Sequence, residues 1–373
     1  TYNEDPIRNT MYGLDFNYRT ESPKLTSWLN KLPFYETNVM STITAYGEAA
    51  LLKPGHPPQI GKGKAGLIFI DDFEGSRNSI DLRFPLVSWG ISSTPANNGL
   101  FPEANYRDSL PYGFNRAKIA WYNIEPVLQD RRSGNNPVRT YEDFSDPRIR
   151  PVNLTQIYPN RTPDLGQSQL VTFDIAYYPT DKGPYNYDAE NVTADGKLLN
   201  PQNRWGGIMR GLDQVDFETG NVEFIEFWMQ DPYIKTPSST GGQLYFNLGN
   251  ISEDVLKDGK RFFENGISGA VTKALEDPDT RWGKVPGNPL QVTQAFSNDP
   301  ADRQLQDAGF DGLVNEAERE KFAAYLQELA NRFGTSSKVY QDALNDPSND
   351  DFLNYRDGQY DQTRSGILGR YKN

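Results

Sequence analysis

The chain has 373 residues with 50 acidic and 38 basic side chains, a net charge of −12, so its long-range field repels nucleic acid and attracts cations or basic partners. It contains no cysteine, which excludes disulfides, thiolate zinc sites and a cysteine nucleophile. Its one histidine, His56, lies in a turn next to a proline, where neither a general base nor a metal ligand is expected.

Two runs of alternating apolar and polar side chains occupy much of residues 1–52, at 11–19 and 41–52. In the second run Ile43 lies on the apolar face and Thr44 on the opposite one, because successive side chains of a strand point to opposite faces. The alternation predicts strands. They are either strands of a barrel whose outer face meets lipid or ordinary half-buried edge strands.

An apolar run at 67–70 predicts a buried strand that ends at Asp71 and Asp72, followed by a turn at Gly75. The two carboxylates would form an acidic lip at the rim of a sheet. They either solvate and cap the strand end or belong to a site.

Plentiful glycine, proline, tyrosine and phenylalanine predict a mainly β fold with long loops and few helices. Strands are expected near 66–71, 79–91, 117–123, 168–178, 205–212, 222–230 and 243–248. Residues 222–229 are apolar on both faces, which predicts a central strand of a jelly-roll-like β-sandwich with Trp228 in its core. The loops 131–136 and 182–203 are long enough to predict a functional surface or a contact surface for another protein.

Helices are expected late in the chain, over 252–258, 316–332 and 337–344, with Ser252 as an N-cap and Gly334 as a C-cap. The resulting organisation is 1–52 (alternating barrel or edge strands), 53–64 (a linker rich in proline and glycine), 65–295 (the β-sandwich) and 296–373 (a helical extension).

Residues 307–318 match the 12-residue calcium loop of an EF-hand at several positions. Gly312 supplies the sharp turn, whereas Gly309 departs from the pattern where an oxygen ligand is wanted. The candidate Ca²⁺ ligands are Asp307, Asp311, Leu313 through its carbonyl, Asn315 and Glu318. The alternative is a helix N-terminus with an acidic lead-in, without a metal. No other cofactor is expected.

Six segments together resemble the SprA/Sov family, the outer-membrane translocons of the type IX secretion system that are also known as gliding-motility protein SprA. They are 70–82 (IDDFEGSRNSIDL), 177–188 (YYPTDKGPYNYD), 204–211 (RWGGIMRG), 222–228 (VEFIEFW), 242–254 (GQLYFNLGNISED) and 367–372 (ILGRYK). The resemblance spans nearly the whole chain. It implies an internal fragment of a much larger protein, which agrees with a start that lacks the pattern of a signal peptide.

The resemblance implies a giant β-barrel pore that exports folded proteins across the cell outer membrane. The chain would supply a non-enzymatic, soluble insert or cap facing the periplasm or the cell surface, which shapes or gates the pore or docks partners. The family's partners include exported proteins, a small cargo-collecting barrel protein and a periplasmic plug. No catalytic residues come with it.

Two other interpretations follow from the residues. A carbohydrate-binding jelly-roll module of a cell-surface protein would use exposed aromatic side chains and a structural calcium ion. A hydrolase would pair two carboxylates, such as Asp72 with Glu74 or Glu226, at a separation that the sequence does not reveal.

Overall fold

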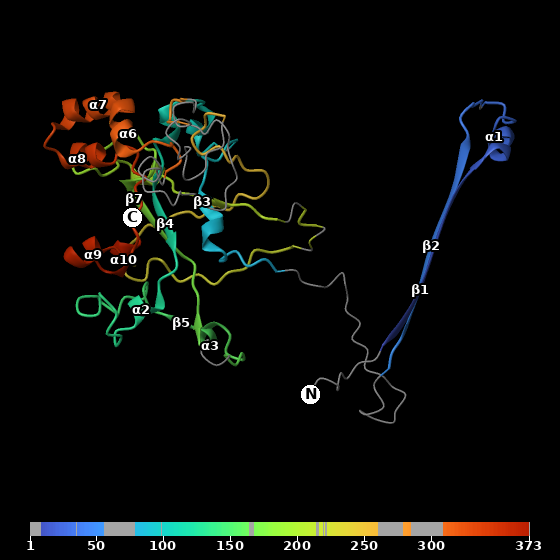
Figure 1. Ribbon diagram of the computed structural model, residues 1–373, viewed down its shortest axis with the longest axis horizontal. Coiled ribbons are helices and arrows are strands. Elements are labelled where there is room, and N and C mark those ends of the chain that lie inside the picture. The colour runs from blue at the N-terminus through green and yellow to red at the C-terminus, as the bar shows by residue number, and fades with distance from the viewer. Residues whose placement is uncertain are drawn as a thin grey trace, which may run out of the picture. The chain divides into compact units, whose positions relative to one another are not determined.

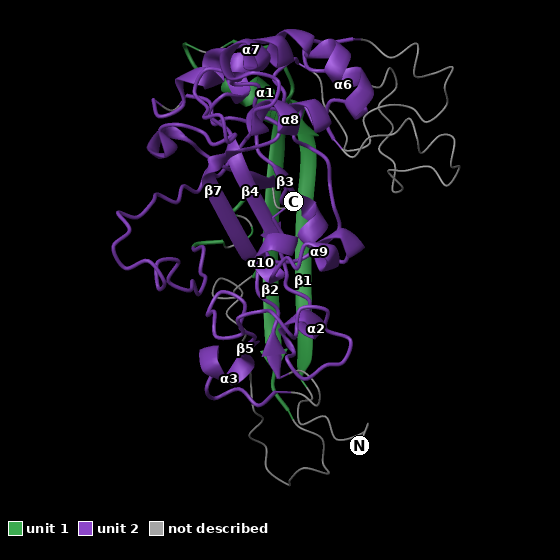
Figure 2. Cartoon of the chain, turned by 90° about the vertical axis from the view of Figure 1, so that its left-hand side faces the viewer, with its two compact units in different colours: residues 1–79, 216–223 green, residues 80–215, 224–373 purple. Residues whose placement is uncertain are grey.

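The computed structural model describes residues 9–34, 36–55, 79–97, 99–163, 168–213, 216–218, 220, 222–259, 279–284 and 309–372. The expected strand 66–71, the acidic lip, most of the expected linker and the expected boundary at 295 lie outside the described residues. The chain divides into two compact units (Figure 2): Thr1–Ser79 with Asp216–Glu223, and Ile80–Val215 with Phe224–Asn373.

The first unit contains a long antiparallel pair of strands, β1 (Thr10–Ser22) and β2 (Ser41–Lys53). The pairing is regular over the whole length, from Thr10 opposite Lys53 to Ser22 opposite Ser41. Between the strands lies α1 (Pro23–Leu29), whose N-cap Ser22 accepts a hydrogen bond from the Leu25 amide. The two strands predicted from alternation are therefore confirmed.

In the second unit the described strands form three further antiparallel pairs. The pairs are β3 (Trp89–Ile91) with β8 (Ile208–Arg210), β4 (Ala117–Tyr122) with β7 (Asp174–Lys182), and β5 (Val152–Asn153) with β6 (Gln169–Leu170). The described fold is thus rich in antiparallel strands, as expected. The strand predicted at 117–123 is confirmed by β4, and only the end of the one predicted at 79–91 forms a strand, as β3.

Short helical turns connect these strands. They are η1 (Leu86–Ser88), η2 (Pro102–Asn105), η3 (Leu110–Gly113), α2 (Pro126–Gln129), α3 (Leu154–Ile157) and η4 (Pro201–Asn203). Proline occupies the first turn of most of them, where its missing N–H costs no hydrogen bond.

The prediction of a central strand at 222–230 with Trp228 in the core is wrong. These residues form no strand, and the Trp228 side chain is 75 % exposed. Residues 243–248 likewise form no strand. An apolar pattern on both faces of a segment indicates that it needs cover on both sides, and the described part of the chain does not supply that cover.

The C-terminal part is helical, with α6 (Asn315–Lys321), α7 (Ala323–Phe333), α8 (Lys338–Asn345), α9 (Gly358–Gln362) and α10 (Ile367–Arg370). The single helix predicted at 316–332 is broken at Phe322, whose backbone (φ −99°, ψ 24°) departs from helical values. Gly334 ends α7 at φ +82°, as predicted, a conformation that glycine tolerates best.

The prediction of a helix at 252–258 is wrong, because these residues form no helix. The Ser252 hydroxyl does accept a hydrogen bond from the Asp254 amide at 3.2 Å. A side chain of this kind favours a turn as readily as it favours a helix start, and here only the turn forms.

The main core of the second unit joins the loop after β7 to the helices α6–α8. Tyr187 stacks on Phe322 with ring centroids 4.2 Å apart and meets Tyr325 edge-on at 5.6 Å. Trp282 is fully buried beside them. Residues 183–189 of the predicted surface loop 182–203 pack inside the chain, whereas most of 190–203 is exposed, so a functional or partner surface stays a prediction for the second part.

Lys182, at the end of β7, links this loop to α7. Its ammonium donates hydrogen bonds to the Asp188 carbonyl (2.6 Å) and the Tyr325 hydroxyl (2.7 Å). Burial lowers the pKa of Lys182 to about 7, against the opposing effect of the Asp188 carboxylate.

A second core lies at the other end of β4. Tyr122 stacks on Tyr371 with centroids 4.6 Å apart, and Tyr371 stacks on Tyr355 at 4.7 Å. In Figure 1 the helices α6–α8 lie toward one end of the β4–β7 pair, while α2, β5 and α3 lie toward the other. The C-terminal residues therefore complete a core that begins with β4.

Substitution of Leu329 by alanine tests the main core. Leu329 is fully buried on α7, so Leu329→Ala is expected to lower the free energy of unfolding by about 2–5 kcal/mol in urea denaturation. Glu328→Ala, on the exposed side of the same helix, should change it by less than about 0.5 kcal/mol. Equal effects of the two variants would contradict this packing.

Candidate metal centre

Three carboxylates from two separate segments converge at the start of α6. Asp311 precedes the helix, Glu318 lies within it, and Asp350 comes from the connection between α8 and α9. One oxygen from each residue lies within 4.8 Å of the others. Asp311 and Glu318 are fully buried, and Asp350 is half-buried.

The turn at Asp311 depends on two glycines. Gly312 follows it at φ +66°, as the predicted calcium loop requires. Gly283 approaches so closely that a side-chain Cβ would lie 1.9 Å from the Asp311 carbonyl oxygen. That carbonyl accepts a hydrogen bond from the Lys284 amide at 2.7 Å. Residues 279–284 therefore hold the backbone on which the Asp311 carboxylate is placed.

Ser348 donates hydrogen bonds to two of the acids. Its hydroxyl donates to Asp311 Oδ2 at 2.6 Å, and its amide donates to Glu318 Oε2 at 3.2 Å. The other oxygen of Glu318, Oε1, is buried and has no hydrogen-bond partner among the described residues. A buried carboxylate oxygen without a donor costs free energy, and a proton or a cation would remove that cost.

The electrostatics of the cluster are unfavourable for three ionised acids. Burial, and after it the charges of Asp311 and Asp346, raise the pKa of Glu318 well above its usual range. Burial and the Asp351 carboxylate raise the pKa of Asp346 to about 6. Carboxylate oxygens are ligands that hard divalent cations prefer, so a bound cation of this type would offset the repulsion between these acids.

The structure brings together some of the predicted calcium ligands. Asp311 and Glu318 meet, whereas Asp307 lies outside the described residues. Leu313 is buried, and its amide donates to Asp311 Oδ1 at 3.0 Å. Asn315 lies outside the triad and its side-chain amide donates to Asp351 Oδ2 at 2.8 Å.

Sequence reasoning missed Asp350 and Ser348. Their only local signal is the polar run 345–351 (NDPSNDD), which is as typical of an ordinary turn as of a metal-binding loop.

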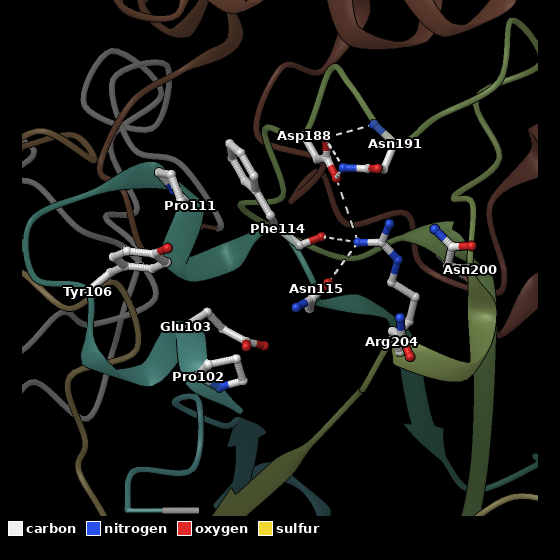
Figure 3. A pocket seen from close by; sticks show the side chains of 11 residues that line it. Pro102, Glu103, Tyr106, Pro111, Phe114, Asn115, Asp188, Asn191, Asn200 and Arg204 are labelled. Carbon is white, nitrogen blue, oxygen red and sulfur yellow. Dashed lines mark hydrogen bonds and ion pairs between the residues drawn. The ribbon is translucent and has the colours of Figure 1, made fainter. Parts of the chain in front are cut away.

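A separate pocket of about 340 Å³ opens beside η2 and η4 (Figure 3). Arg204 lies at one side, paired with Asp188 at 3.6 Å and donating to the Phe114 carbonyl at 2.7 Å. Glu103 lies opposite and is 5 % exposed. Its Oε1 accepts a hydrogen bond from the Trp205 indole at 3.1 Å, while its Oε2 has no partner among the described residues. Four asparagines, at 115, 191, 200 and 203, complete much of the polar lining.

No family model and no curated protein matches the chain. Membership of the translocon family is therefore a proposal. None of the helices in the described part of the chain combines the length and the apolar character needed to cross a membrane.

Removal of the Ser348 hydroxyl tests the network around the acids. Ser348→Ala leaves Asp311 Oδ2 without that donor and also removes the contact with the Tyr187 hydroxyl at 2.9 Å. We expect the free energy of unfolding to fall by about 1–3 kcal/mol, measured in urea. Ser336→Ala, at an exposed position, is the control and should be nearly neutral. A neutral Ser348→Ala would show that these hydrogen bonds contribute little.

Proposed function

We propose that the chain is a non-enzymatic part of an outer-membrane translocon of the type IX secretion system, in which it acts in cell-surface export and gliding motility. The β1–β2 pair anchors it at the membrane-embedded wall, and the second unit is a soluble insert that shapes or gates the pore or docks partners. The proposal rests on the family resemblance of six segments and on one structural observation, the two-faced character of the β1–β2 pair.

The pairing register places most of the large apolar side chains of both strands on one face. Residues directly opposite in an antiparallel pair share a face. Tyr12, Leu14, Phe16 and Tyr18 of β1 stand opposite Leu51, Ala49, Gly47 and Ala45 of β2. The Phe16 and Tyr18 rings stack with centroids 6.3 Å apart, as expected for side chains on the same side of a strand.

The other face is mainly polar and carries charge, although Met11 stands opposite Leu52 at its end. Asp15 stands opposite Glu48, Asn17 opposite Tyr46, and Arg19 opposite Thr44. A soluble hairpin with one polar face would bury its apolar face on a core, yet Leu14 is 70 % and Phe16 is 54 % exposed. An isolated two-stranded hairpin is also marginally stable in water. The apolar face therefore needs an apolar environment.

The dimensions of this face suit a lipid bilayer. It runs from the pair Tyr12–Leu51 to the pair Thr20–Ile43, which is nine positions along β1. A strand that crosses a bilayer needs about 9–11 residues, with apolar side chains outward and aromatic side chains near the interfaces. Along this face of β1 the order is Tyr12, Leu14, Phe16 and Tyr18, so a tyrosine lies at each end of the apolar pair.

Features of the second unit support an insert that contacts other proteins. Residues 222–251 carry many exposed apolar side chains, including Phe224, Trp228 and Leu248. Large exposed apolar areas of this kind are typical of protein contact surfaces. In the proposed translocon, the described strands between 65 and 295 belong to a jelly-roll-like sandwich that lacks the central strand expected at 222–230. The antiparallel pairing of all the described strands of this region supports that architecture.

Cysteine labelling tests the membrane-facing assignment, and the absence of native cysteine from these residues allows single-cysteine variants. In the intact translocon in cells, with any cysteine elsewhere replaced, Leu14→Cys and Phe16→Cys should resist a water-soluble maleimide because lipid covers them. Asp15→Cys and Asn17→Cys should react several-fold faster. Lys24→Cys in α1 is the exposed reference. Equal labelling on the two faces would refute the assignment.

A carbohydrate-binding module is the second candidate, and the pocket beside η2 and η4 favours it. The exposed Tyr106, several asparagines and Glu103, whose Oε2 has no hydrogen-bond partner among the described residues, are groups that bind sugar rings and hydroxyls. Calorimetric titration with a panel of soluble polysaccharides should then show binding that Glu103→Gln weakens at least about tenfold, since one charge-assisted hydrogen bond is worth about 1.5–3 kcal/mol. An absence of binding to every polysaccharide would exclude this candidate.

A further inference from the structure

We propose that Asp311, Glu318 and Asp350 together bind one Ca²⁺ ion, which joins the start of α6 to the 346–351 connection. The proposal does not depend on the translocon assignment. It also differs from the loop predicted from sequence, because one ligand comes from beyond residues 307–318.

The burial of Glu318 separates this cluster from the ordinary acidic patches of a surface. Its side chain is 0 % exposed, and Oε1 has no hydrogen-bond partner in the described part of the chain. No Lys or Arg of that part forms an ion pair with Glu318 within 4.0 Å. A buried carboxylate oxygen without a hydrogen-bond partner, in a residue grouped with two other carboxylates, is a position that a cation stabilises strongly.

The donor set selects a hard cation. All three groups are carboxylates, and the chain has no cysteine, so a soft metal finds no thiolate in this cluster. A charge of +2 would offset most of the charge of three ionised acids. Water and neighbouring carbonyl groups would complete the six to eight oxygen ligands that Ca²⁺ takes.

The number of carboxylate ligands favours Ca²⁺ over Mg²⁺. Ligand oxygens bind Ca²⁺ at about 2.3–2.6 Å, so oxygens on opposite sides of the ion lie up to about 5 Å apart. For Mg²⁺, at about 2.0–2.1 Å, the corresponding limit is about 4 Å. Mg²⁺ also keeps several waters and takes one or two carboxylates, whereas three carboxylates from the chain fit the larger and more flexible ligand shell of Ca²⁺.

The site lies where three parts of the second unit meet. Asp311 and Glu318 belong to the start of the helical region, and Asp350 belongs to the connection after α8. The same connection contacts the loop after β7, since the Tyr185 amide donates to the Ser348 carbonyl and Asn349 donates to the Lys182 carbonyl, each at 2.7 Å. An ion here would therefore cross-link segments that are far apart in sequence.

Calorimetry and melting curves of the purified 373-residue chain test the proposal. After treatment with EGTA and its removal, we expect CaCl₂ to bind with a stoichiometry of one at this site. Binding to the folded state should raise Tm in a concentration-dependent way, and MgCl₂ at the same concentration should raise it less. Tb³⁺, which replaces Ca²⁺, should gain luminescence sensitised by the buried Tyr185 and Tyr187 and lose it on addition of CaCl₂.

Three substitutions locate the ion. Glu318→Gln and Asp350→Asn keep the side-chain size and remove one charged ligand, so each should weaken Ca²⁺ binding at least about tenfold. Glu316→Gln makes the same chemical change on the exposed side of α6, where the side chain is 79 % exposed, and should bind Ca²⁺ like the parent chain. Circular dichroism in EGTA establishes that each variant is folded.

Two results would overturn the proposal. One is a parent chain that shows neither a Ca²⁺-dependent Tm shift nor Tb³⁺ luminescence. The other is Ca²⁺ binding that Glu318→Gln and Asp350→Asn leave unchanged, because the ion would then lie elsewhere. Asp350 is only half-buried, so Asp350→Asn remains informative if Glu318→Gln does not fold.

Discussion

The burial of two carboxylates, Asp311 and Glu318, is the constraint on which the arrangement of the second unit depends. Both are fully buried, so both need donors, and Ser348 supplies a donor to each from a distant part of the chain. The same serine contacts the Tyr187 hydroxyl, and its carbonyl accepts from the Tyr185 amide. Satisfying the acids therefore brings the C-terminal connection, α6 and the loop after β7 to one place.

The first unit differs from the second in what it leaves exposed. The β1–β2 pair satisfies its backbone by a regular antiparallel register, but its apolar face remains exposed. Aromatic and aliphatic side chains at this density gain free energy only when a core or a lipid phase covers them. The first unit thus leaves an apolar face without cover among the described residues, as the proposed membrane anchor would, whereas the second unit is stabilised by its own cores.

Local signals predicted the elements that a short residue pattern marks. Period-two alternation located β1 and β2, the helix expected at 337–344 forms as α8, and Gly334 ends α7 as expected. The predictions failed where packing between distant segments decides the structure. Residues 222–229 are apolar on both faces, which is typical of a central strand. Such a strand also needs a neighbouring strand on each side, and without them the Trp228 side chain is exposed.

The same distinction between local and tertiary effects holds for the residues of the candidate metal centre. The sequence by itself determined that Asp311 and Glu318 would lie close together, because seven residues with a sharp turn at Gly312 place them at one helix start. Only the tertiary structure decided that Asp350 and Ser348 would join them, since their approach depends on the packing of α7 and α8 against the aromatic core. Covalent spacing fixes short-range geometry, whereas contacts between distant residues follow from the free energy of the whole fold.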